Sequence, residues 1–113
     1  MLERAVMKNV RLWCGQHDIV CFRVNVGKVR VLRDDGTLDW FDTGLPKGFP
    51  DLLALGHNGR SYFIETKKPK NAYQRKEQKD FQAMAEARGF IYILARSEED
   101  VAKIILKEEN IND

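Results

Sequence analysis

The fold depends most on one stretch, Pro50-Asp-Leu-Leu-Ala-Leu-Gly-His-Asn-Gly-Arg-Ser-Tyr-Phe-Ile-Glu-Thr-Lys67. Two short apolar runs in it flank the turn-forming residues at 56–60, which predicts a β-hairpin. Asp51 opens the first run. In the second run Glu65 and Lys67 are two residues apart, so their side chains leave the same face of the strand. The stretch therefore predicts a hairpin that carries two acids and an ammonium group at one end.

The length of the hairpin loop decides whether the two acids share a face. Opposed residues of an antiparallel pair have a constant index sum, so a three-residue loop at 57–59 places Asp51 opposite Glu65. A two-residue Asn58-Gly59 loop would place Asp51 opposite Thr66, on the other face. Asn-Gly is a strong two-residue signal, but a type I turn closed by a left-handed glycine is also common. The three-residue loop is our prediction.

Two carboxylates directly opposite each other indicate a bound cation. Like charges in that position destabilise a sheet, and a hard ion with oxygen ligands, Mg²⁺ or Mn²⁺, would neutralise them. Each fragment has a simpler explanation, since Asp after Pro often opens a strand and Glu-x-Lys can be a solvated ion pair. The placement of Asp51 and Glu65 at corresponding hairpin ends favours the metal site.

The composition fits one compact globular domain over residues 1–113, with 43% hydrophobic and 32% charged residues. No segment has the length of a transmembrane helix. The N-terminus lacks the basic-then-apolar order of a signal peptide, so we expect a cytoplasmic protein without membrane contact. Cys14 and Cys21 are not a Cys-x-x-Cys pair and lack clustered histidines. We expect reduced packing residues rather than a disulfide, and no zinc site.

The net charge of +2 is unevenly distributed. Basic residues gather in two stretches: Arg4, Lys8, Arg11, Arg23, Lys28, Arg30 and Arg33 in the first, and Lys67, Lys68, Lys70, Arg75, Lys76 and Lys79 in the second. A basic strip beside an acidic pocket suits a metal-dependent enzyme that acts on a polyphosphate, because released counter-ions add affinity. Charge runs are also commonly just solvated faces.

The remaining patterns predict a helix over residues 2–16, a half-buried strand over 19–26 and a hairpin formed by 29–33 and 37–42. In the strand, Val20 and Phe22 fall on the face expected to be buried. The hairpin, with Leu38, Trp40 and Phe41, is expected either to form part of an interface or to cap its own core. Both readings stay open.

A second helix is expected from about 73 to 88, then a buried strand over 90–95, which implies a parallel strand pairing with a right-handed crossover. Ser97 should cap a last helix, with Asp100 in a capping box. On the inward side of the second helix, Gln74 and Gln78 are positioned either to hold a water or carboxylate or to bond locally.

Glu3 falls inside the apolar arc of the first helix. An acid on a buried stripe needs a partner, since an unpaired buried charge is costly. Alternatively, Glu3 simply occupies the first turn, where a negative charge suits the helix dipole. The periodicity favours neither.

In order, these features resemble the virus-type replication-repair nuclease (VRR-NUC) branch of the PD-(D/E)XK nuclease superfamily. The resemblance covers nearly the whole chain and rests on the helix bearing Glu3, the strand at 22–27, Gly44 to Asp51, Phe63 to Lys67, Gln78 with Phe81, Gly89, and the strand at 91–96 with Ser97. It is least clear at the hairpin over 29–42, and the family's arginine motif survives only as Ala95-Arg96-Ser97.

The resemblance implies an α/β fold, a restriction-endonuclease-like mixed sheet flanked by helices in the order α-β-(β-β)-β-β-α-β-α. It implies a metal-dependent DNA endonuclease of replication, repair or recombination, selective for branched or Holliday-junction-like DNA. The enzyme would be a homodimer in a bacterial or phage-infected cell. The alternatives are a non-catalytic nucleic-acid-binding module on the same fold and an RNA-directed metal-dependent hydrolase.

The resemblance also implies roles for particular residues. Asp51, Glu65 and the Thr66 backbone carbonyl would bind Mg²⁺ or Mn²⁺, and Glu3 would complete the acidic cluster. Lys67 would orient the attacking water and help its deprotonation, with Gln78 in support. The DNA-binding residues would be Lys68, Lys70, Arg75 and Lys76.

Overall fold

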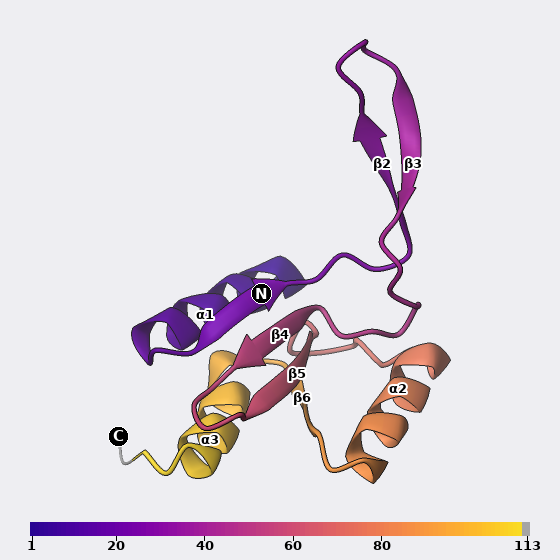
Figure 1. Cartoon of the computed structure of the whole chain (residues 1–113). Coiled ribbons are helices and arrows are strands. Elements are labelled where there is room, and N and C mark those ends of the chain that lie inside the picture. The colour runs from indigo at the N-terminus through magenta and orange to yellow at the C-terminus, as the bar shows by residue number, and fades with distance from the viewer. Residues whose placement is uncertain (112–113) are drawn as a thin grey trace.

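The computed structural model describes residues 1–111, which form a four-stranded mixed sheet, three helices and a separate two-stranded hairpin (Figure 1). The elements are α1 (Glu3–Gln16), β1 (Val20–Arg23), β2 (Lys28–Leu32), β3 (Leu38–Asp42), β4 (Leu52–Leu55), β5 (Ser61–Thr66), α2 (Lys76–Ala87), β6 (Ile91–Ala95) and α3 (Glu98–Glu108). This confirms the expected element order and mixed α/β class. No helix in this described part is long and apolar enough to cross a membrane.

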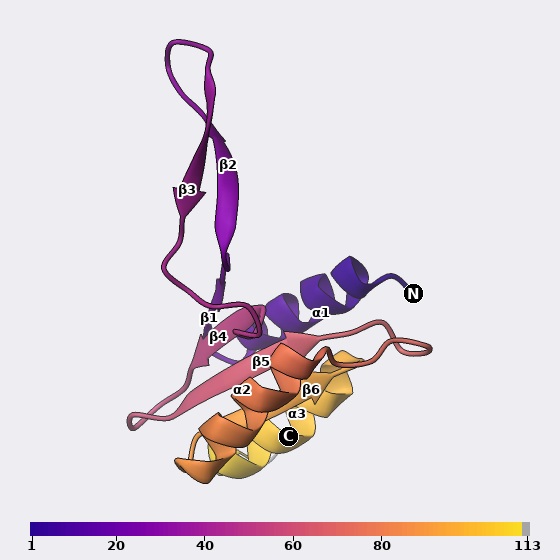
Figure 2. The same cartoon turned by 90° about the vertical axis from the view of Figure 1, so that its right-hand side faces the viewer.

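β2 and β3 form an arm, residues 28–42, that extends away from the rest of the molecule (Figures 1 and 2). The two strands pair antiparallel, with Arg30 opposite Trp40, and among the described elements they pack extensively only against each other. Their large apolar side chains are exposed, Leu32 by 72% and Trp40 by 63%. The arm therefore does not cap the core of its own chain.

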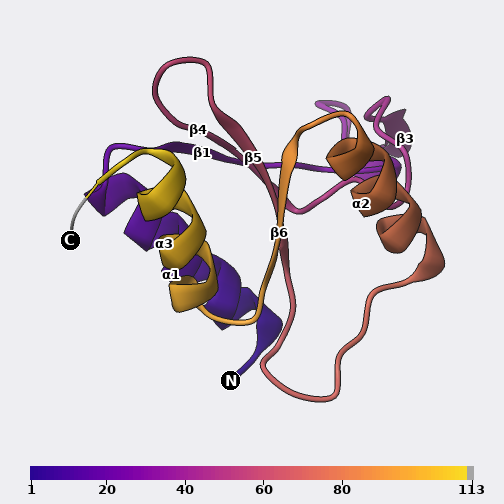
Figure 3. The same cartoon turned by 90° about the horizontal axis from the view of Figure 1, so that it is seen from below.

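The sheet has strand order β1-β4-β5-β6, and it separates two helical layers. α1 and α3 pack together on one face, and α2 lies on the other (Figure 3). The main core lies under α1 and α3 and includes Val6, Val10, Trp13, Leu52, Tyr62, Ile64, Ile93, Val101 and Ile105. Aromatic rings fill the side of α2, with Phe63 and Phe81 5.4 Å apart between centroids. β5 pairs with β6 in parallel, which confirms the predicted parallel strand pairing.

The β4–β5 hairpin has the predicted three-residue register, with Leu53 opposite Phe63 and Leu55 opposite Ser61. Its turn differs from the expected type. Asn58 and Gly59 both adopt left-handed φ angles, 58° and 77°. Asn-Gly therefore makes the tight turn whose twist matches the strands, and His57 is the extra residue.

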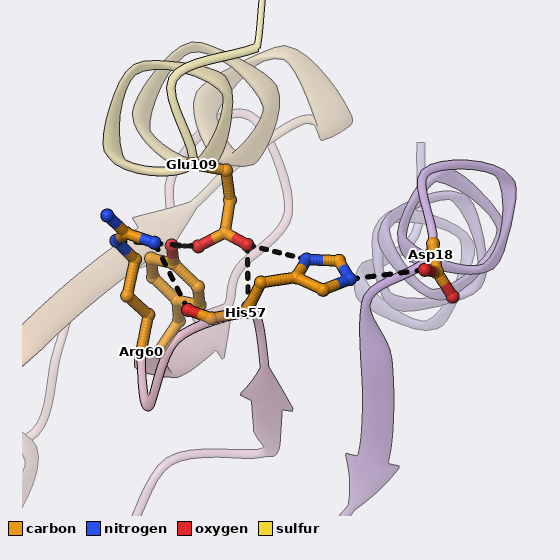
Figure 4. A network of polar contacts seen from close by, with 5 residues as sticks. Asp18, His57, Arg60 and Glu109 are labelled. Atoms are coloured by element: carbon orange, nitrogen blue, oxygen red, sulfur yellow. Dashed lines mark hydrogen bonds and ion pairs between the residues drawn. The ribbon is translucent and has the colours of Figure 1, made fainter.

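Glu109, just after α3, binds this extra residue (Figure 4). Its side chain is only 2% exposed. The carboxylate accepts hydrogen bonds from His57 N–H (2.7 Å) and the Tyr62 hydroxyl (2.6 Å), and Arg60 Nε lies 3.8 Å away. Burial acts to raise the pKa of Glu109, but the hydrogen bonds from Tyr62 and His57 outweigh it and hold that pKa below its usual value. The end of α3 thus anchors the hairpin turn.

The prediction for β1 was wrong in length and in facing. The strand ends at Arg23, and Val20 and Phe22 are exposed rather than buried. β1 is an edge strand, and α1 covers the face that carries Cys21. α2 packs against β6, at the opposite edge of the sheet, and leaves the Val20–Phe22 face uncovered.

The start of α2 and the capping of α3 also differ from prediction. α2 begins at Lys76 rather than near 73, because Gln78 Oε1 accepts a hydrogen bond from Arg75 N–H (2.8 Å) and fixes the helix start there. Ser97 is the N-cap of α3 as expected, but the capping box is not formed. Asp100 accepts instead from Arg96 N–H (2.9 Å).

Candidate active site

Asp51 stands where the chain enters β4. The preceding loop is tightly placed: Gly48 has φ +92°, and an added Cβ there would lie 2.3 Å from the Glu77 carbonyl oxygen, so α2 presses directly on it. Asp51 Oδ2 accepts hydrogen bonds from Thr66 N–H (2.8 Å) and the Thr66 hydroxyl (3.1 Å). These bonds fix the carboxylate against the end of β5.

Glu65 is a fully buried carboxylate on β5, facing the α2 side. Its Oε1 accepts hydrogen bonds from the Tyr92 hydroxyl and from Gln74 Nε2 (3.1 Å). Its Oε2 makes no hydrogen bond within the described residues and has only Lys67 Nζ nearby, as an ion-pair contact at 3.4 Å. A buried carboxylate oxygen without a hydrogen bond is costly.

Tyr92 donates its hydroxyl hydrogen bond to Glu65. The pKa of Tyr92 lies well above its usual value. Burial is the largest cause, followed by the hydrogen bond to Glu65 and the negative charges of Glu65 and Asp51. The hydroxyl therefore stays protonated and can only donate to Glu65. Asp51 is bound by Thr66, the residue next to Glu65, so the two carboxylates lie at the same end of the β4–β5 hairpin.

The two glutamines predicted to face inward have different hydrogen-bond partners. Gln74 donates to Glu65, whereas Gln78 caps the start of α2. Gln74 also bonds Gln82 Oε1 (2.9 Å), so its amide is held from α2. Sequence reasoning placed both glutamines inward but could not separate them. It missed Tyr92, although a tyrosine in a buried strand needs a partner for its hydroxyl, which was an available signal.

Glu3 lies exposed in the first turn of α1 and lines the same groove as Asp51. Among residues 1–111, no three acidic, histidine or cysteine side chains form a group that could hold a metal. The structure places Asp51 beside Thr66, at the same end of the hairpin as Glu65, and does not draw Glu3 into a three-residue cluster with them. Neither sequence-based reading of Glu3 is decided by this placement.

The predicted DNA-binding residues Lys68, Lys70, Arg75 and Lys76 are all exposed, between β5 and the start of α2. Arg96 Nη1 donates to the Lys68 carbonyl (3.1 Å) and ties this segment to the end of β6. Lys76 is partly neutralised by Asp80, at 2.8 Å. The segment leaves the sheet immediately after Lys67, so its cations begin at the edge of the site.

The donor set fits a hard divalent cation. Within the described residues, Glu65 Oε2 is a buried carboxylate oxygen that lacks a hydrogen bond, and Asp51 supplies a second carboxylate at the same end of the β4–β5 hairpin. Mg²⁺ and Mn²⁺ prefer carboxylate and carbonyl oxygens. The Thr66 carbonyl remains a predicted ligand.

Comparison with known proteins gives the family. The model of the VRR-NUC domain matches residues 3–99, so this chain belongs to the VRR-NUC family. Membership indicates a nuclease-type function, in a family whose members are typically metal-dependent. A solved structure described as a VRR_NUC domain is similar with a TM-score of 0.67 and 21% identity, over 91% of this chain and 92% of that chain. This likeness shows the fold. No curated protein matches the chain.

Proposed function

We propose that this protein is a metal-dependent DNA endonuclease that hydrolyses phosphodiester bonds in an active site formed by Asp51, Glu65 and Lys67. The observation that carries the proposal is Glu65 Oε2, a buried carboxylate oxygen that has no hydrogen bond within residues 1–111 and has the Lys67 ammonium 3.4 Å away. A structural ion pair would be expected to satisfy both oxygens. An oxygen kept unsatisfied is instead ready for a ligand that enters from outside.

Asp51 and Glu65, with the Thr66 carbonyl, would hold Mg²⁺ or Mn²⁺, and Glu3 would join directly or through water. When bound, the ion supplies Lewis-acid stabilisation of the phosphate and lowers the pKa of water. Thr66 holds Asp51 in place through two hydrogen bonds. Tyr92 and Gln74 hold Glu65 Oε1, which leaves Oε2 facing Lys67.

Lys67 acts on the water and on the phosphate. Its side chain is 13% exposed, so the ammonium lies at the boundary between the buried carboxylate and solvent. From there it can orient the attacking water by a hydrogen bond, favour its deprotonation by positive charge, and offset negative charge on the phosphorane. Gln78 supports the site through the start of α2, and Lys68, Lys70, Arg75 and Lys76 hold the backbone of the DNA.

The substrate we propose is branched DNA, cut by a homodimer. The arm supports dimerisation because an isolated two-stranded hairpin is at best marginally stable in water. Apolar side chains lie on both of its faces: Trp40 and Leu32 on one, Phe41 and Val31 on the other. A second copy would cover them.

The sheet offers a second uncovered surface, formed by Val20, Phe22 and Leu55 on β1 and β4. One chain thus has two apolar surfaces that it does not cover itself. Packing between two copies would bury both and place two active sites on one junction.

The test is a panel of labelled linear duplex, flap, four-way-junction and RNA substrates, each incubated with Mg²⁺, Mn²⁺ or EDTA. Glu65→Gln serves as the inactive control, because it keeps the shape of the side chain but removes its charge. We expect cleavage of junction or flap DNA with either metal, and none with EDTA or the variant. Binding without cleavage would support the non-catalytic module, and cleavage of RNA alone would support the RNA-directed hydrolase.

A further inference from the structure

A groove of about 880 Å³ lies between α1 and β1, and Asp51 forms part of its wall. Its volume is near the upper end of the roughly 300–1,000 Å³ of small-molecule pockets. Four cations line it, Arg4, Lys8, Arg11 and Arg23, together with the acids Glu3 and Asp51. We call it the α1–β1 groove.

The sequence builds this groove through helical periodicity. Arg4, Lys8 and Arg11 follow the i, i+4, i+7 spacing and fall within about 60° of one another on α1. The opposite arc of α1, with Val6 and Val10, is buried in the core. Because β1 is an edge strand, no further strand closes the groove on its outer side.

The groove cations lack ion-pair partners in the part of the chain that the structure describes. Within residues 1–111, Arg4, Lys8, Arg11 and Arg23 form no ion pair, whereas Lys76 on α2 is paired with Asp80. Converging cations repel one another, and an anion placed among them offsets this repulsion. The groove is therefore suited to a negatively charged ligand.

The groove opens at the candidate active site. Arg23 pairs with Leu52, the residue after Asp51, and Val24 N–H donates to the Asp51 carbonyl (2.8 Å). In Figures 2 and 3, the N-terminal end of α1 and the segment between β5 and α2 lie at the same end of the molecule. The candidate site thus has the groove on one side and Lys68 and Lys70 on the other.

We propose that the α1–β1 groove is a strand-binding subsite, which holds the sugar-phosphate backbone on one side of the scissile phosphate. This rests on the proposed nuclease function. Arg4, Lys8 and Arg11 are spread over about 10 Å along the axis of α1 and contact successive phosphates. Met7, Leu12 and Ile19 supply an apolar wall for the sugars. Such contacts position the strand without reading its sequence.

The first measurement is DNA affinity in the Glu65→Gln background with EDTA, where cleavage does not interfere. The double variant Lys8→Gln/Arg11→Gln should bind a single-stranded oligonucleotide at least about tenfold more weakly. The slope of log K against log salt should become shallower by roughly 1.4, for two lost phosphate contacts. The matched control is Lys103→Gln/Lys107→Gln on α3, which removes two exposed cations and should change neither quantity.

The second measurement locates the strand. Leu12 is exposed and lines the groove, so in a Cys21→Ser background, which removes the native thiol of the groove, Leu12→Cys provides a single thiol there for alkylation by a maleimide. Bound oligonucleotide should slow that reaction, while Lys103→Cys should react at the same rate with and without DNA. Equal protection by a mononucleotide at the same nucleotide concentration would overturn the strand proposal in favour of a small anion.

The two proposals fail in different ways. If the wild type cleaves DNA but the groove variant binds normally and Leu12→Cys is unprotected, the subsite proposal is overturned and the nuclease proposal stands. If Leu12→Cys is protected and the groove variant binds weakly, but the wild type cleaves nothing, the groove is supported as a nucleic-acid site and the nuclease proposal fails.

Discussion

The molecule contains two β-hairpins whose surroundings differ completely. β4 and β5 lie inside the sheet, with neighbours on both sides and helices above and below, whereas β2 and β3 stand alone as an arm. Both follow from turn residues between short apolar runs. Local sequence therefore decides that a hairpin forms, and packing decides what the hairpin does: the first holds a candidate active site, and the second presents an apolar surface.

The largest effect, a loss of cleavage, should come from changes to the two acids of the β4–β5 hairpin. Glu65→Gln and Asp51→Ala should each reduce metal-dependent cleavage at least ~10³-fold, because several kcal/mol of transition-state stabilisation are lost. Their stabilities should differ. Asp51→Ala removes two hydrogen bonds to Thr66 and should destabilise the fold by about 1–3 kcal/mol.

Glu65→Gln should keep or raise stability without metal, since it removes a buried charge whose Oε2 has no hydrogen bond. Cleavage assays and urea unfolding check both variants. Full activity in Glu65→Gln would remove this residue from the catalytic machinery.

The next largest effect should be a loss of stability when Glu109, which anchors the turn of the β4–β5 hairpin, is removed. Glu109→Ala should lower the free energy of unfolding by about 2–4 kcal/mol, because the Tyr62 hydroxyl and the His57 N–H lose their acceptor. Urea denaturation measures it. The neighbouring Glu108→Ala changes an exposed residue and should shift stability by less than about 0.5 kcal/mol. Equal effects in the two variants would mean that the turn needs no anchor.

A substitution in the β2–β3 arm should instead change the oligomeric state and leave the stability of the single chain unchanged. Trp40→Glu places a charge on an exposed side chain, so the fold of one chain should tolerate it while the dimer dissociates. Light scattering should report a dimer for the wild type and a monomer for the variant, with unchanged circular dichroism. A wild-type monomer would sink the dimer proposal.

The smallest effect should be a pH dependence of stability that arises from His57 in the β4–β5 turn. Hydrogen bonds to Glu109 and then to Asp18 raise the pKa of the exposed His57. Protonated His57 therefore adds stability, present in full below the unfolded-state pKa of about 6.5 and lost as pH rises through the raised folded-state pKa. Thermal melting from pH 5 to 9 should show this decline in the wild type and a flatter profile in His57→Asn.

The sequence predicted features that depend on short-range rules. The element order and the three-residue register of the β4–β5 hairpin both follow from alternation and loop length. Even there, the turn type was missed, because the N–H of the extra residue His57 is satisfied by Glu109, 52 positions away.

Other features depended on distant partners, and local patterns could not supply them. Val20 and Phe22 alternate like a buried strand face, but none of the described helices covers their face of β1, since α1 packs on the other face. Tyr92 and Gln74 reach Glu65 from different elements, and their contacts require the completed crossover. That the arm extends away from the sheet likewise depends on the fold of the whole chain and not on residues 28–42 alone.

Thermal melting with added Mg²⁺ tests most directly whether the buried oxygen of Glu65 belongs to a metal site in the folded protein. An ion that binds only the folded state raises the melting temperature by mass action. We predict a rise that grows with Mg²⁺ concentration in the wild type and is lost in Glu65→Gln, with Glu108→Gln behaving as the wild type. Equal rises in the wild type and Glu65→Gln would contradict the account.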